Sequence, residues 1–381
     1  MLSRNLLLIF FSNFVGAFGE GLYFFLFPAY ILELKADAVQ LGAVFSILNL
    51  ASALTIIPGG ILTDKYDRKK IVFFSWLVWA FAPLAYSLAD RWSQLFLGAA
   101  LWGASMFGAP AITAYVIASV KKESVMSATS IVSASWTMGY VFSPALGGYL
   151  ADVFSMKLVL HLSFILSLLC TSFYLFIASQ HPKKASVTQS PLISVARHNK
   201  RKMILWAGLL AAIAFTFYLT RPFVVPFFQD ELHLNDFQIG LLGSATWLGA
   251  ALLGVFLGRI GDRWKKAGAV FVCMMFYLVS IIILIVFRQF PTAALASFLM
   301  GGSFMAGMLV SSIIGSIAPE ARMGRWISVP QTTGMLAAVF APYLGGWLYG
   351  NSVYYPFIAT IAVTPLLAVL TLAKPLAKEA S

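Results

Sequence analysis

The sequence predicts an all-α integral membrane protein, with twelve spanning helices in two six-helix bundles of related sequence. Three observations support this fold class. The 381 residues are 60% hydrophobic and only 10% charged, whereas a soluble protein is about 25% charged. Apolar stretches of roughly 20 residues, long enough to cross a bilayer, recur along the whole chain. The two halves of the chain also match each other at one constant offset.

Each apolar stretch is interpreted as a helix, because a helix satisfies its own backbone in lipid and a barrel would show short alternating strands. The first stretch is too long for a cleaved signal peptide. Cys170 and Cys273 lie inside spans, where we expect free buried thiols. The predicted spans are 5–32, 39–62, 70–89, 92–118, 125–151, 156–178, 203–229, 237–258, 267–287, 292–317, 326–349 and 353–373.

The net charge of +12 follows the predicted topology. With the N-terminus in the cytoplasm, 21 Lys and Arg residues fall on the cytoplasmic side and four on the other, and Arg221 lies within a span. This bias is typical of a plasma-membrane protein with both termini inside. The basic balance therefore needs no nucleic-acid partner. We expect the protein to be a monomer whose outer surface contacts membrane lipids.

The two halves repeat at an offset of 198 residues. Asp64 matches Asp262 and Gly60 matches Gly258 at this offset. Chance matches would scatter over many offsets, so the chain is interpreted as a duplicated six-helix unit whose copies run parallel. The predicted domains are an N-terminal bundle (1–178), a polar cytoplasmic linker (179–202) and a C-terminal bundle (203–381).

A charged loop, "GGILTDKYDRKK" at 59–70, separates the second and third spans, and "GRIGDRWKKA" at 258–267 is its copy. The first loop resembles the major facilitator superfamily pattern Gly-x-Leu-x-Asp-basic-x-Gly-basic-basic. Asp67 stands where that family has glycine, and we expect it to tolerate the left-handed backbone of a tight turn. The residues that carry the resemblance or its copy are Gly60, Asp64, Lys65, Arg68, Lys69, Gly258, Asp262 and Arg263.

The resemblance implies a gate in these loops. Asp64 would meet the N-terminus of a helix in the other half, and Asp262 would do the same against the fifth span. Arg68 and Lys69 would hold the acid in place. The alternative is a basic cluster that only sets topology.

A second motif, "GYVFSPALGGYL" at 139–150, resembles the fifth span of the exporter, or antiporter, branch of this family. "AVFAPYLGGWL" at 338–348 repeats it. Small residues allow close helix contacts in lipid, and proline interrupts the hydrogen-bond ladder. Ala99 departs from the branch, which has an arginine at that place. The residues predicted to pack helices are Gly139, Pro144, Gly147, Gly148, Pro342, Gly345 and Gly346.

Glu20 and Arg221 are charged residues at membrane depth, so both should face the protein interior. Three interpretations stay open. The pair forms a structural salt bridge; Glu20 takes up and releases a proton as the pair separates; or one of them binds substrate directly.

The resemblance implies a central cavity between the bundles, and polar and aromatic residues near mid-span fit its walls. Aromatic walls with few hydrogen-bonding groups suit an amphiphilic or drug-like molecule. The residues expected to line the cavity are Asn13, Tyr23, Phe24, Asn49, Trp102, Ser105, Trp136, Phe217, Tyr218, Trp247 and Gln331.

The sequence has neither a phosphate loop nor a metal-binding cluster, so we expect no enzyme activity and no cofactor. The resemblance implies a secondary transporter that exports small molecules in exchange for protons by alternating access. Uptake or uniport of an organic anion bound by Arg221 is one alternative. A receptor or lipid-handling protein that lost transport is another.

Overall fold

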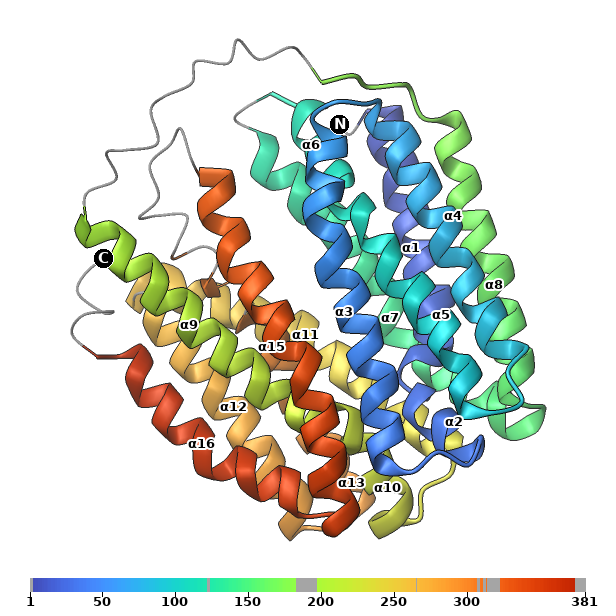
Figure 1. The fold of residues 1–381 in the computed structure, drawn as a ribbon, viewed down its shortest axis with the longest axis vertical. Coiled ribbons are helices and arrows are strands. Elements are labelled where there is room, and N and C mark those ends of the chain that lie inside the picture. The colour runs from blue at the N-terminus through green and yellow to red at the C-terminus, as the bar shows by residue number, and fades with distance from the viewer. Residues whose placement is uncertain are drawn as a thin grey trace. The chain divides into compact units, whose positions relative to one another are not determined.

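A computed structural model describes residues 3–121, 124–182, 197–264, 266–306, 309, 310, 313 and 323–373 (Figure 1). Side chains are described for these residues except 126, 197–203, 262–264, 266, 305 and 323–331. All the regular structure in the described part is helical. Eight helical segments there are long and apolar enough to cross a membrane, and two shorter apolar helices accompany them. The all-α membrane fold predicted from the sequence is confirmed.

Contacts along the chain divide it into two compact units. Unit 1 comprises 1–185 with 233–244, and unit 2 comprises 186–232 with 245–381. Residues 233–244 follow the predicted linker in sequence, yet they pack with the first bundle. The division therefore falls inside one helix, α11 (Asp236–Trp264), as well as in the linker.

In unit 1, α1 packs against both α7 and α8. Pro28 and Pro110 lie in the first turns of α2 and α6, where proline is favoured. The first predicted span is accordingly divided into α1 and α2, and the fourth contains α5, the short 3-10 turn η2 and α6. The helices are α1 (Arg4–Phe24), α2 (Phe27–Glu33), α3 (Ala38–Thr63), α4 (Arg68–Ser87), α5 (Leu95–Ala104), η2 (Ser105–Gly108), α6 (Ala109–Ala118), α7 (Val125–Val153) and α8 (Met156–Ser172).

In unit 2, α9 packs against α15, and α12 packs against α16. Arg221 begins a short 3-10 turn that interrupts the seventh span, because Pro222 lacks the backbone N–H that would continue the α-helix. The helices are α9 (Arg197–Thr220), η5 (Arg221–Phe223), α10 (Val224–Leu232), α11 (Asp236–Trp264), α12 (Lys266–Val286), α13 (Phe290–Gly301), η6 (Gly302–Met305), α15 (Met323–Asn351) and α16 (Tyr355–Thr371). The first residues of α11 belong to unit 1.

The 198-residue repeat is visible in backbone geometry. Lys35 and His233, with φ of 63° and 53°, are the two described non-glycine residues in the left-handed region, and they are 198 apart. A Cβ on Gly103 would lie 2.3 Å from the Leu48 carbonyl oxygen. A Cβ on Gly301 would lie 2.0 Å from that of Thr246. Both pairs are related by the same offset, so the two copies share their turns and helix contacts.

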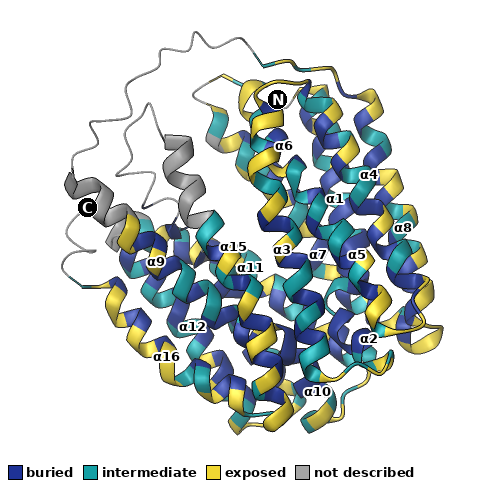
Figure 2. Cartoon of the chain, in the orientation of Figure 1, coloured by how far each residue is buried: buried dark blue, intermediate teal, exposed yellow. Residues whose placement is uncertain are grey.

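Both units leave large apolar side chains exposed, shown in yellow on many helices in Figure 2. Phe142 and Leu88 in unit 1 are 73% and 67% exposed, and Phe340 in unit 2 is 70% exposed. A soluble protein rarely exposes apolar surface on this scale. Apolar exposure on this scale fits helices that lie in lipid.

Candidate functional site

A buried carboxyl is the most unusual group of unit 1. Glu20 on α1 is 1% exposed. The Trp102 indole N–H of α5 donates to its Oε1 at 2.6 Å, and the side chain of Tyr140 on α7 also forms a hydrogen bond with the carboxyl group. Phe24 stacks on Trp102 with ring centroids 5.6 Å apart. Three helices thus hold one acidic side chain at a defined place.

The neighbours of Glu20 on α1 are not all available to a ligand. Tyr23 is fully buried and packs its ring on Phe27 and Tyr86, 6.2 and 6.0 Å away between centroids. The expectation that Tyr23 lines a cavity is therefore corrected: its side chain points toward α4 in the bundle core. Ser105 is also fully buried, and its hydroxyl donates to the Trp102 carbonyl at 2.6 Å. Its role is in helix packing.

The remaining predicted cavity residues of unit 1 differ in exposure. Asn13 and Asn49 are buried, and no described residue donates a hydrogen bond to the Asn13 side-chain oxygen. Trp136 is half-buried, with its ring stacked on that of Trp76 at 6.0 Å. Phe24 and Trp102 are likewise half-buried. These three half-buried aromatic side chains form the part of the predicted set that another molecule can contact.

A cation and aromatic rings meet in unit 2. Arg221 is exposed, and its guanidinium carbon lies 4.0 Å from the centre of the Phe304 ring and 6.0 Å from that of Tyr218. Trp247 packs on Phe304, with 4.9 Å between centroids. Phe217 instead turns into the core against Tyr277. The pairing of Glu20 with Arg221 would join the two units and stays a prediction, as does any role of Gln331, whose side chain lies outside the described part.

The charged loop differs from its expected geometry. Asp67 has φ of −59°, not a left-handed conformation, and its carboxylate accepts the Lys69 N–H at 3.1 Å as the N-cap of α4. The Arg68 guanidinium binds the Ala114 carbonyl, and the Lys69 amine binds the Leu175 carbonyl. The expectation that these two basic residues hold Asp64 is wrong. Asp64 itself is exposed, and the side chains of Asp262 and Arg263 lie outside the described part.

Gln180 links this loop to the end of the sixth span. Its backbone N–H donates to Asp67 at 3.0 Å, and its carbonyl accepts from the Arg68 N–H at 3.0 Å. Its side chain bonds Arg68, the Tyr115 carbonyl and the Ser119 hydroxyl. Sequence reasoning placed Gln180 in the linker and missed this role. The unusual acid at the glycine position of the loop motif was the available signal.

Asp67→Ala is expected to lower the free energy of unfolding by about 1–3 kcal/mol, because it removes the acceptor of two partly buried N–H groups, those of Lys69 and Gln180. Burial raises the pKa of Asp67, but hydrogen bonds from Gln180 and Lys69 outweigh it and lower the pKa below 3.8. This stabilisation is therefore complete above the unfolded pKa and is lost as pH falls through the lower folded pKa. Thermal unfolding in detergent measures the effect. Exposed Asp64→Ala is the control, and an equal loss in both variants contradicts the prediction.

Small residues bring α7 close to two other helices of unit 1. Cβ atoms added to Gly139 and Gly147 would lie 2.7 Å from the Phe14 carbonyl oxygen and 1.8 Å from that of Leu22, both on α1. A Cβ on Gly148 would lie 2.2 Å from the Asp236 carbonyl oxygen of α11. In unit 2, one on Gly345 would lie 2.1 Å from the Leu219 carbonyl oxygen. Pro342 and Gly346 are buried. A Cβ added to Gly60 or Gly258 would have no described neighbour within 4 Å.

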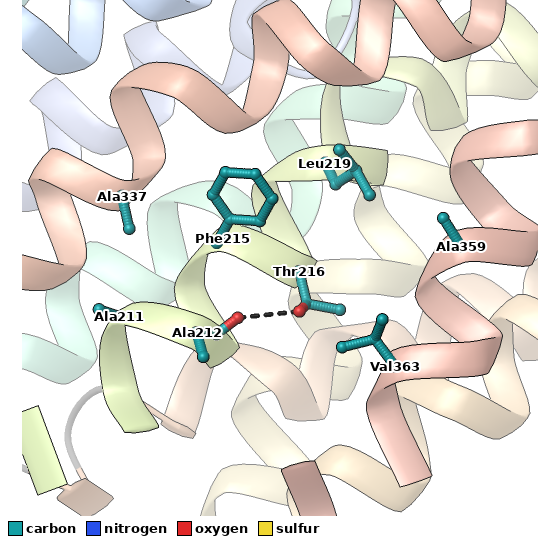
Figure 3. Close-up of a pocket in the computed structure, with 8 residues that line it drawn as sticks. All are labelled: Ala211, Ala212, Phe215, Thr216, Leu219, Ala337, Ala359 and Val363. Carbon is teal, nitrogen blue, oxygen red and sulfur yellow. Dashed lines mark hydrogen bonds between the residues drawn. The ribbon is translucent and has the colours of Figure 1, made fainter. Parts of the chain in front are cut away.

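An apolar pocket of about 470 Å³ lies in unit 2 among α9, α15 and α16 (Figure 3). Its one polar side chain, Thr216, donates to the Ala212 carbonyl of its own helix at 2.8 Å. No group of metal-binding side chains occurs among the described residues. The lining residues are Ala211, Ala212, Phe215, Thr216, Leu219, Ala337, Ala359 and Val363.

Duplicated helical bundles that expose large apolar side chains define a multi-pass membrane protein. The model of the Major Facilitator Superfamily matches residues 9–223 and 210–380. The chain belongs to this family. Transporters of the family generally need no cofactor, and their substrates are small molecules.

Curated relatives match almost the whole chain. The multi-drug resistance efflux pump PmrA homolog of Lactococcus lactis subsp. lactis (strain IL1403) is 27% identical over 97% of this chain and 93% of its own length. Multidrug resistance protein 2 of Bacillus subtilis (strain 168) is 21% identical over 93% and 91%. The quinolone resistance protein NorA of Staphylococcus aureus (strain COL) is 20% identical over 95% and 94%.

Solved structures share the fold. The nucleoside transporter NupG aligns with a TM-score of 0.75 and 14% identity, covering 97% of this chain and 98% of the other. A bacterial homologue of the iron transporter ferroportin, in an inward-facing state, aligns with a TM-score of 0.72 and 18% identity over the full length of both chains. At these identities the likeness establishes the fold alone.

Proposed function

We propose that this protein exports amphiphilic, drug-like small molecules in exchange for protons. The observation that carries the proposal is the carboxyl of Glu20. Among the described residues, Glu20 and Asp67 are the only buried acids, and Asp67 lies in a loop between spans. A buried acid within a span that accepts hydrogen bonds from Trp102 and Tyr140 is a fitting group to carry a proton across the membrane. The names of the curated relatives support drug efflux.

The proposed mechanism is alternating access by two repeats, 1–178 and 203–381, joined by a cytoplasmic linker, 179–202. Both termini lie in the cytoplasm of a plasma-membrane monomer. Glu20 binds a proton from outside while Asp64 and Asp262 hold the cytoplasmic side closed, and it releases the proton inside once that side has opened. Half-buried Phe24, Trp102 and Trp136 offer aromatic surface to an amphiphile with few hydrogen-bonding groups.

Flux in proteoliposomes tests the proposal. Purified protein is reconstituted and loaded with a panel of fluorescent amphiphiles, and a pH gradient is imposed in either direction. Transport that follows the gradient and stops with a protonophore is expected. A chain that moves none of these compounds in either direction would instead be a receptor or lipid-handling protein.

A second candidate, transport of an organic anion, rests on Arg221. Its exposed guanidinium above Phe304 presents positive charge beside apolar rings, an arrangement that suits an aromatic carboxylate. Uptake or uniport through this group needs no proton exchange. The two candidates differ in which charged residue controls flux.

Arg221→Ala is expected to raise the apparent KM for anionic amphiphiles roughly tenfold, since a hydrogen bond to a charged group is lost. The KM for neutral amphiphiles should change little, because the ring contact between Phe304 and Trp247 remains. Initial rates for matched acid and methyl-ester dyes measure the difference. Arg288→Ala, which removes a cation from an ion pair with Glu231, is the control. If all flux disappears in Arg221→Ala and anions alone are moved by the wild type, anion transport replaces the first candidate.

A further inference from the structure

An acidic side chain of α7 caps the first turn of α11 in unit 1. The Asp152 carboxylate accepts the backbone N–H groups of Asp236 and Phe237 through its two oxygens, at 3.1 and 3.0 Å. The next N–H, of Gln238, goes to the Asn235 side chain at 2.9 Å. The first N–H groups of a helix have no partner inside it, and they attract negative charge. Asp152 therefore supplies acceptors for the first N–H groups of α11, although it lies on a helix about 80 residues earlier in the chain.

The same two helices touch below this cap. Added Cβ atoms on Gly148 and Gly240 would lie 2.2 Å from the Asp236 carbonyl oxygen and 2.3 Å from the Pro144 carbonyl oxygen. The backbone N–H of Ala145 on α7 donates to the Ser244 hydroxyl of α11 at 3.1 Å. Small residues thus allow backbone-to-backbone contact, and Asp152 supplies charge-assisted hydrogen bonds at its end.

The repeat shows that this bond is not a requirement of the six-helix fold. Position 350, equivalent to Asp152, is glycine, and a Cβ there would meet no described residue within 4 Å. The starts of α3 and α11 share the same local cap, because Asp37 accepts the Gln40 N–H as Asn235 accepts the Gln238 N–H. The Asp152 hydrogen bonds are therefore an addition found at α11. One copy of the duplicated unit therefore has the cross-helix acid and the other does not.

We propose that Asp152 is a gating residue. Its carboxylate holds the start of α11 against α7, and these hydrogen bonds must break before the side of the protein opposite the basic loops can open. This role rests on the proposed alternating-access function. Helix α7 belongs to the first repeat by sequence and α11 to the second, while residues 236–244 pack in unit 1 and 245–264 in unit 2. A helix divided in this way connects the two repeats, so a bond at its start controls whether they separate there.

Disulfide trapping tests the gate. Tyr149 and Phe237, whose rings are 6.0 Å apart, are changed to cysteines after Cys170→Ser and Cys273→Ser. Asp152→Asn keeps one acceptor oxygen but loses the charge, and Asp152→Ala loses both. We expect the rate of oxidative cross-linking to fall roughly threefold to thirtyfold with alanine and less with asparagine. Labelling of a single cysteine at 237 by an impermeant maleimide should rise in the same order.

Asp90→Ala is the matched control, because Asp90 is an exposed acid of unit 1 paired with Lys157 on a different contact. Equal cross-linking and labelling in the Asp152 and Asp90 variants would overturn the gate. Thermal unfolding checks that each variant is folded, and if alanine unfolds the protein, the asparagine variant decides. These measurements need neither substrate nor gradient. A wild type without proton-driven flux would overturn the proposed function and leave the cross-linking result standing.

Discussion

Glu20→Gln is expected to reduce pH-gradient-driven efflux to the level of liposomes without protein, while substrate binding persists. Glutamine has the shape of the carboxyl group and keeps an oxygen that can accept from the Trp102 indole N–H. It cannot bind and release a proton in the physiological range. Gradient-driven flux and substrate counterflow at equal pH on both sides, measured on one preparation, separate coupling from binding.

The control for this experiment is Asp90→Asn, which neutralises an acid whose side chain is 78% exposed. It should transport like the wild type. Accumulation driven by a pH gradient in Glu20→Gln would show that another group carries the proton. Loss of counterflow together with driven flux would instead place Glu20 among the residues that bind substrate.

Gly147→Ala is expected to abolish the folded protein or to destabilise it by about 3 kcal/mol or more. The new Cβ would lie 1.8 Å from the Leu22 carbonyl oxygen, which is backbone that no side-chain rotation can move. Helices α1 and α7 would have to separate, and overpacking of this kind commonly costs about 1–3 kcal/mol when side chains can still adjust. Size-exclusion profiles and thermal unfolding of the detergent-purified protein measure the loss.

Gly208→Ala is the matched control, since Gly208 lies within α9 and an added Cβ there meets nothing within 4 Å. Alanine should stabilise this helix by up to about 1 kcal/mol, because it costs less backbone entropy than glycine. If Gly147→Ala folds as well as Gly208→Ala, the packing of α7 on α1 differs from the one described.

The residues whose roles depended on which face of a helix packs inward were the hardest to predict. Tyr23 and Phe24 are adjacent on α1, yet one lies in the core against Tyr86 and the other stacks on Trp102. Helical spacing assigns residues to a face that spans about a quarter of the helix circumference. A face of that width includes both a core position such as Tyr23 and a half-buried position such as Phe24. Hydropathy also does not tell a lipid-facing side chain from a core side chain, because both are equally apolar.

Long-range polar contacts were missed for a different reason. Asp67 and Gln180 meet across 113 residues, and Asp152 reaches α11 across 84. Each looks like an ordinary loop or helix-end residue in the sequence, because the partner is a backbone N–H that any residue supplies. Asp67 in place of a glycine was the one local signal, and it was interpreted as a turn instead of a cap.

The sequence alone determined the membrane location and the twelve-helix fold with its duplication, because these depend on composition, length and repeat period, which need no knowledge of contacts. The resemblance to the family rested on the loop motif at 59–70. It also singled out Glu20, since a carboxyl within an apolar span is costly wherever it points. Tertiary structure decided which helices hold that carboxyl, which charges in the loop are bonded, and where α7 meets α11. Those facts depend on the distance between groups far apart in the chain, and only the packed helices set it.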